Sequence, residues 1–119
     1  MMEMGPSRQA NATELAAAAL SAVIAIRDHL QQQTHGWSNQ VAAQDIEGEI
    51  VRILAVEPYA SEAAYLNERV AALRGWLDIL FSERKHLKYG GSDQVKVFVL
   101  SELGKIDKWL HRPELLQRA

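Results

Sequence analysis

The amino-acid sequence predicts an all-α protein that folds as a single four-helix bundle. Apolar residues recur at helical spacing in four segments, and three turn signals separate these segments. The chain of 119 residues is long enough to bury one hydrophobic core and too short for two. Its 48% hydrophobic and 24% charged residues are typical of an ordinary globular domain. The sequence contains no cysteine, which excludes disulfide scaffolds, thiol nucleophiles and cysteine-ligated metals.

The first expected helix begins near Asn11 or Thr13, which are both good N-caps, and ends at about Gln33. The next residues, Thr34-His35-Gly36, are typical of a helix end. Residues 1–10 include a Gly-Pro-Ser sequence and show no periodic pattern. We therefore expect a disordered, mobile lead over residues 1–10 and one helical-bundle domain over residues 11–119.

The second expected helix begins at Ser38 or Asn39 and ends at Val56, because Pro58 restricts the backbone of the residue before it. The third has Ser61 as its N-cap and continues to about residue 88. Its length follows from an apolar stripe on one helical face, formed by Leu66, Val70, Leu73, Leu77, Leu80 and Leu87.

The fourth expected helix follows the break at Gly90-Gly91, with Ser92 or Asp93 as its cap, and ends before Pro113. A short helical tail, Glu114-Leu115-Leu116, completes the chain. The stripe of the fourth helix consists of Val95, Phe98, Val99, Leu103, Ile106, Trp109 and Leu110.

Two segments could instead be strands, because residues 49–56 and 94–100 are rich in β-branched side chains. We favour helices for two reasons. The helical period of the second segment continues through Ile106 to Trp109, which is too long for an ordinary strand. No tight hairpin signal joins the two segments.

The segment from Leu15 to Ile26 is apolar at every position except Ser21. It is too short to cross a bilayer, which needs about 20 residues, and its alanine-rich composition after Glu14 is unlike that of a signal peptide. A helix without a polar face must be covered all round, whereas a helix in a four-helix bundle buries about half its circumference.

We therefore predict a non-enzymatic protein that acts through protein–protein association, self-associating through its first helix, most simply as a homodimer. The expected interface residues on that helix are Leu15, Ala18, Ala22, Ala25 and Ile26. Trp37 joins them as a partner anchor, because it lies in a turn where a core does not explain it. The alternative is that the first helix is the central helix of the core and that its alanines reflect helix propensity.

Cations gather where the third expected helix ends, and the amide groups of the following turn lie beside them. Together they could bind a phosphate or a carboxylate. The simpler explanation is that cations at a helix C-terminus complement the helix dipole. The residues of this candidate anion site are Arg84, Lys85, His86, Lys88, Gly90, Gly91 and Ser92.

The segment His86-Leu87-Lys88-Tyr89-Gly90-Gly91-Ser92 resembles, over these seven residues, the histidine-phosphotransfer domains. Those domains are helical bundles with an exposed histidine that is followed closely by lysine and glycine. In them the small residue lies one turn later in the same helix, whereas Gly90-Gly91 predicts a helix break. The resemblance implies an alternative function, a phosphotransfer or small-anion-binding regulatory module centred on His86, with its imidazole as nucleophile.

Other functions have weaker support in the sequence. The net charge of −2 and the lack of a long basic stripe argue against nucleic-acid binding. The sequence predicts no cofactor and no metal site, because Glu83 and His86 form only one of the two Glu-x-x-His pairs that a di-iron bundle needs. A small enzyme with an unidentified acid and base stays a third alternative, which a pocket lined by Asp28, His29 or Glu83 would favour. We expect a cytoplasmic protein, because the absence of cysteine fits a reducing compartment.

Overall fold

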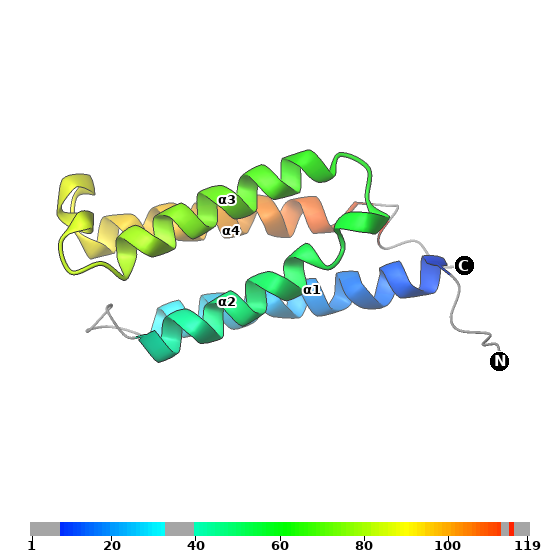
Figure 1. The fold of residues 1–119 in the computed structure, drawn as a ribbon, viewed down its shortest axis with the longest axis horizontal. Coiled ribbons are helices and arrows are strands. Elements are labelled where there is room, and N and C mark those ends of the chain that lie inside the picture. Colours follow the sequence, from blue (N-terminus) through cyan, green and yellow to red (C-terminus); the bar gives the residue numbers. More distant parts are fainter. Residues whose placement is uncertain (1–7, 33–39, 113–114, 116–119) are drawn as a thin grey trace.

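The computed structural model describes residues 8–32, 40–112 and 115 of the chain (Figure 1). Four α-helices form there, and the described residues contain no strand: α1 (Arg8–Gln32), α2 (Gln40–Leu54), α3 (Ala63–Leu80) and α4 (Ser92–Leu110). Two short 3₁₀ helices, η1 (Glu57–Tyr59) and η2 (Lys85–Tyr89), lie before and after α3. The prediction of an all-α four-helix bundle is confirmed, and the two β-branched segments lie in α2 and its C-terminal turn and in α4.

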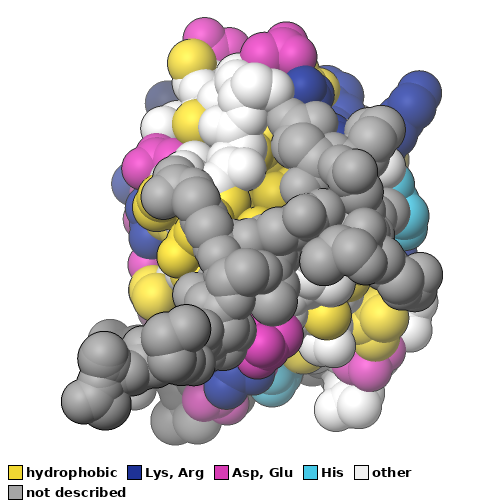
Figure 2. All heavy atoms as spheres, turned by 90° about the vertical axis from the view of Figure 1, so that its right-hand side faces the viewer, with side chains coloured by type: hydrophobic (Ala, Val, Ile, Leu, Met, Phe, Trp, Pro, Cys, Tyr) yellow, Lys and Arg dark blue, Asp and Glu magenta, His cyan; other side chains and the backbone are white. Residues whose placement is uncertain are grey.

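The helices form two antiparallel pairs, α1 with α2 and α3 with α4, which lie one above the other in Figure 1. Helix α1 packs against both α2 and α4, whereas α2 and α3, at the front of the view, pack together less extensively. Seen from the end where α1 begins and α4 ends, charged side chains lie around the rim and hydrophobic side chains appear between them (Figure 2). The bundle therefore has an apolar interior that is more closely packed at the back, between α1 and α4, than at the front.

One apolar core joins all four helices, because each contributes side chains at helical spacing to the same interior. Its largest fully buried members are Ile26, Leu30, Ile46, Ile50, Ile53, Leu66, Leu73, Leu80, Leu103, Ile106, Leu110 and Leu115. Leu115 belongs to the expected C-terminal tail, whose other residues lie outside the described part of the chain. In that part, no helix has both the length and the apolar character that a membrane crossing requires.

Helix α3 ends at Leu80, which corrects the prediction that it continues to about Lys88. Beyond Leu80 the hydroxyl of Ser82 accepts the backbone N–H of Lys85 at 3.2 Å, so a side chain takes the place of a helical acceptor. The chain then forms η2, whose Tyr89 ring packs edge-on against Trp76 with ring centres 5.2 Å apart. Leu87, expected in the apolar stripe, is 66% exposed as a result.

Several helix starts also differ from the prediction. Helix α1 begins at Arg8, so residues 8–10 of the expected lead are helical, and residues 1–7 lie outside the described part of the chain. The N-cap of α3 is Glu62, at φ 58°, and not Ser61, whose hydroxyl accepts a hydrogen bond from Arg112 instead. Gly91 caps α4, and the expected caps of α2, Ser38 and Asn39, lie outside the described residues.

The position of Leu87 can be tested against Leu80, which occupies the equivalent place seven residues earlier. Leu80 is fully buried, so we expect Leu80→Ala to lower the free energy of unfolding by about 2–5 kcal/mol. The exposed Leu87 should tolerate the same change within about 0.5 kcal/mol. Chemical denaturation followed by circular dichroism measures both values. Equal losses for the two variants would contradict the end of α3 at Leu80.

Candidate functional site

The outer side of α1 carries an uncharged strip. Its four exposed residues are Ala17, Ala18, Ser21 and Ile24, which we call the outer strip, and Ile24 is 56% exposed. Exposed carboxylates, Glu14 and Asp28, lie beyond its two ends. The 14 residues from one carboxylate to the other span about 21 Å along the helix. A helix face in contact with water ordinarily carries charged or polar side chains along its length, so this strip is unusual for a solvated surface.

The structure changes which α1 residues are available to a partner. Ala18 is exposed, while Leu15 and Ala25 are partly buried. Ala22 and Ile26, both expected at the interface, are fully buried in the core of their own chain. Ala22 and Ile26 are buried because only one side of α1 faces solvent, and the apolar residues on its other side pack in the core.

The expected interface residues do not include Ala17, Ser21 and Ile24, although a signal for them exists. Ser21 lies seven residues after Glu14 and seven before Asp28. A spacing of seven places residues on the same side of a helix. The two carboxylates therefore mark the face on which the outer strip lies. Trp37, the sixth expected interface residue, is outside the described part of the chain.

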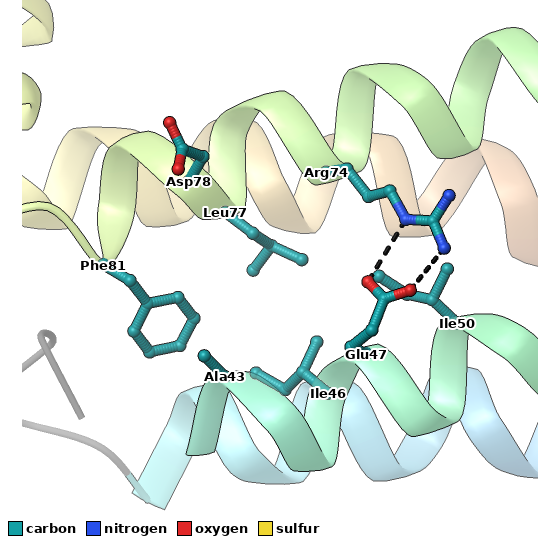
Figure 3. A pocket seen from close by; sticks show the side chains of 8 residues that line it. All are labelled: Ala43, Ile46, Glu47, Ile50, Arg74, Leu77, Asp78 and Phe81. Carbon is teal, nitrogen blue, oxygen red and sulfur yellow. Dashed lines mark hydrogen bonds and ion pairs between the residues drawn. The ribbon is translucent and has the colours of Figure 1, made fainter. Parts of the chain in front are cut away.

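A second candidate surface is the groove between α2 and α3 (Figure 3). Its volume is about 280 Å³, and Ile46, Ile50 and Leu77, nearly or fully buried, form its floor. The guanidinium of Arg74 donates to Glu47 through both Nε and Nη2, which closes the groove on one side (Figure 3). Phe81 lies toward the opposite end of the groove. The groove thus offers a small apolar surface beneath an exposed ion pair.

The candidate anion site at the end of α3 is only partly assembled. Lys85 and Lys88 lie together beside a cavity of about 350 Å³, where Tyr89 and the α3 residues Gly75, Asp78 and Ile79 complete the lining. Lys85 Nζ is 3.1 Å from Asp78 Oδ2, so an acidic group already pairs with one of the two cations. Arg84, His86, Gly90, Gly91 and Ser92 do not line this cavity.

The backbone amides of this segment are also engaged. The N–H groups of Arg84 and Lys85 donate to the Ser82 hydroxyl, at 3.4 and 3.2 Å. The N–H of Gly91 donates to the His86 carbonyl at 2.9 Å. These amides are therefore not directed at a common point where a phosphate could bind. The His86 ring is partly buried, and its Nδ1 has no hydrogen-bond partner among the described residues.

The residues named for an enzyme do not converge on a deep pocket. Asp28 and His29 line a cavity of about 190 Å³ with Ala25 and Gln32, so every lining residue comes from α1. Glu83 lies in the bend after α3 and is exposed. Within the part of the chain that the structure describes, no three His, Asp or Glu side chains are grouped so that they could hold a metal ion.

Comparison with known proteins gives no family assignment. No family model matches the chain, and neither a curated protein nor a solved structure does. Any functional inference therefore depends on the surfaces described above.

Two ion pairs between helices provide a further test of the structure. Glu102 is the buried carboxylate of the described residues, and its Oε1 is 2.9 Å from Arg69 Nη1. Because Arg69 would be left without this partner in a half-buried place, we expect Glu102→Ala to cost about 2–3 kcal/mol of stability.

Glu47→Ala should cost less than about 1 kcal/mol, since water and salt screen the exposed pair that Glu47 forms with Arg74. Urea denaturation of both variants and the native protein measures the difference. If the loss from Glu47→Ala equals or exceeds that from Glu102→Ala, the burial described for the two pairs is incorrect.

Proposed function

We propose that this protein is a non-enzymatic helical-bundle protein that acts through protein–protein association, with a second copy of the same chain bound at the outer strip of α1. The observation that supports the proposal is the exposure of Ile24 and of three small residues on a strip that carries no charge between Glu14 and Asp28. The proposal includes a cytoplasmic location, with which the cysteine-free sequence is compatible.

The outer strip is self-complementary in size. At its ends, however, a two-fold axis at Ser21 would bring the exposed carboxylates Glu14 of each copy and Asp28 of the other near one another, which weakens the dimer. Ser21 lies midway between Ala18 and Ile24, and each is about 4.5 Å from it along the helix axis. Two antiparallel copies of α1 related by a two-fold axis at Ser21 would therefore place Ile24 of each copy over Ala18 of the other. A symmetric dimer requires such a patch, in which each large side chain meets a small one of the partner.

The small residues of the strip favour close contact between the two helices. Alanine and serine allow two backbones to approach nearer than leucine or charged side chains would. Burying the exposed half of Ile24 contributes about 1 kcal/mol per copy. The strip is shorter and narrower than a standard interface of about 1,600 Å². We therefore expect a weak, reversible dimer, with a population that rises with protein concentration.

Placing a charge on the strip tests the proposal. Ala18→Glu puts two carboxylates into the symmetric interface, so we expect it to keep the protein monomeric at concentrations where the native chain dimerises. The matched control is Ala71→Glu, because Ala71 is an exposed alanine on α3. Sedimentation velocity from about 10 μM to about 1 mM covers the range expected for a weak complex.

Two results would overturn the proposal. The first is a native chain that stays monomeric over the whole concentration range. The second is a dimer that Ala71→Glu dissociates as strongly as Ala18→Glu does, because the effect would then come from net charge and not from the strip. Circular dichroism of each variant confirms that its helices are intact.

A further inference from the structure

A cavity lies at the corner of the bundle where α3 begins and α4 ends. Its volume is about 440 Å³, which is within the range of small-molecule sites. The start of α3 contributes Glu62 and Tyr65, and the C-terminal part of α4 with the residues after it contributes Lys105, Lys108, Trp109 and Arg112. We propose that this corner cavity binds a small organic anion that carries a flat ring.

The charge of the lining favours an anion. Three cationic side chains face one carboxylate, in a chain with a net charge of −2. Lys105 and Lys108 are three residues apart and therefore lie on one side of α4, and Arg112, which follows the end of that helix, joins them in the lining. The cavity thus concentrates positive charge on a protein that is acidic as a whole, and such a concentration attracts an anion.

Arg112 is fixed at the edge of this cavity by contacts with both helices. Its Nη2 donates to Ser61 Oγ at 3.1 Å and to Glu62 Oε2 at 2.7 Å. The guanidinium carbon lies 5.3 Å from the centre of the Trp109 ring, over its face. A cation held from several sides loses little conformational entropy when a ligand arrives, which raises affinity.

The two lysines differ in how far they are already engaged. Lys105 Nζ lies 3.5 Å from Glu102 Oε2, and Arg69 shares the same carboxylate. Lys108 is exposed, and among the described residues it has no ion-pair partner. Lys108 is therefore the cation that an anionic group can bind without competing with an existing ion pair.

Two buried N–H groups near this corner have no hydrogen-bond acceptor in the described part of the chain. The buried Nε of Arg69 and the buried Nε1 of Trp109 both lack an acceptor among the described residues. Both groups are enclosed, so they add to the positive potential near the cavity without contacting a ligand in it. The hydrogen bonds to an anionic group such as a phosphate would come from the exposed Lys108.

The exposed ring of Tyr65 is the reason why we expect the ligand to contain a flat ring. Its side chain lines the cavity and is 41% exposed, and the guanidinium carbon of Arg69 lies 5.6 Å from its ring centre. A flat ring can stack on the remaining exposed surface of Tyr65 while its anionic group contacts Lys108. Nucleoside monophosphates combine these two parts, so we use adenosine monophosphate as the probe.

Isothermal titration calorimetry of the full chain with adenosine monophosphate, adenosine and inorganic phosphate tests the inference. We expect saturable binding of the nucleotide that is at least about 10-fold tighter than binding of either part alone. Lys108→Gln should weaken nucleotide binding about 5-fold or more, since it removes a charged hydrogen bond. Tyr65→Leu should weaken binding of the nucleotide and leave that of phosphate unchanged.

The matched control is Arg52→Gln, which removes one positive charge from an exposed position on α2 outside the cavity. It should change nucleotide affinity by less than about 2-fold, because its charge is screened from the cavity by water and salt. No saturable binding below about 10 mM would overturn the proposal. So would an equal loss from Arg52→Gln and Lys108→Gln. Phosphate binding as tight as nucleotide binding would overturn the role of the ring.

Discussion

The buried alanines of α1 determine how closely the helices of this bundle approach one another. Ala12, Ala16, Ala19 and Ala22 follow each other along the inner side of α1 and are nearly or fully buried. Methyl side chains at these positions allow the larger residues of α2 and α4 to fill the interior at close distance. Because α1 contacts both of these helices, its small residues set the width of the core at the back. The front, between α2 and α3, is left with the narrow apolar groove.

Alanine also explains where sequence reasoning succeeded and where it failed. The leucine and isoleucine stripes of the other helices predicted their inner faces, because large apolar side chains and charged ones alternate at helical spacing. Alanine carries neither signal, so the alanines of α1 predicted a helix without indicating which of them meet water. Ala18 and Ala22 are only four residues apart, and one is exposed while the other is fully buried. The positions of Glu14 and Asp28, near the two ends of the apolar segment, indicate which side of α1 faces water.

Two other features depend on contacts that periodicity does not contain. Leu87 continues the α3 stripe by spacing, but the Ser82 hydroxyl and the packing of Tyr89 on Trp76 end the helix before it. The corner cavity brings together residues near positions 62 and 112, which are about 50 residues apart. Such an arrangement follows from the antiparallel order of the helices and the exact rotation of each about its axis. The sequence predicted the order of the helices along the chain, but it did not predict the rotation of each helix about its axis.

The front and the back of the bundle differ in how much of their contact depends on charge. Apolar contacts hold α1 to α4, and these do not weaken as salt is added. At the front the exposed pair of Arg74 and Glu47 links α2 to α3, and mobile ions screen such a pair at physiological ionic strength. Added salt therefore weakens one contact at the front, worth less than about 1 kcal/mol, and leaves the apolar contacts of both sides unchanged. The stability of the bundle should accordingly depend little on ionic strength, because buried side chains such as Ile46, Ile50 and Leu77 hold the front as well.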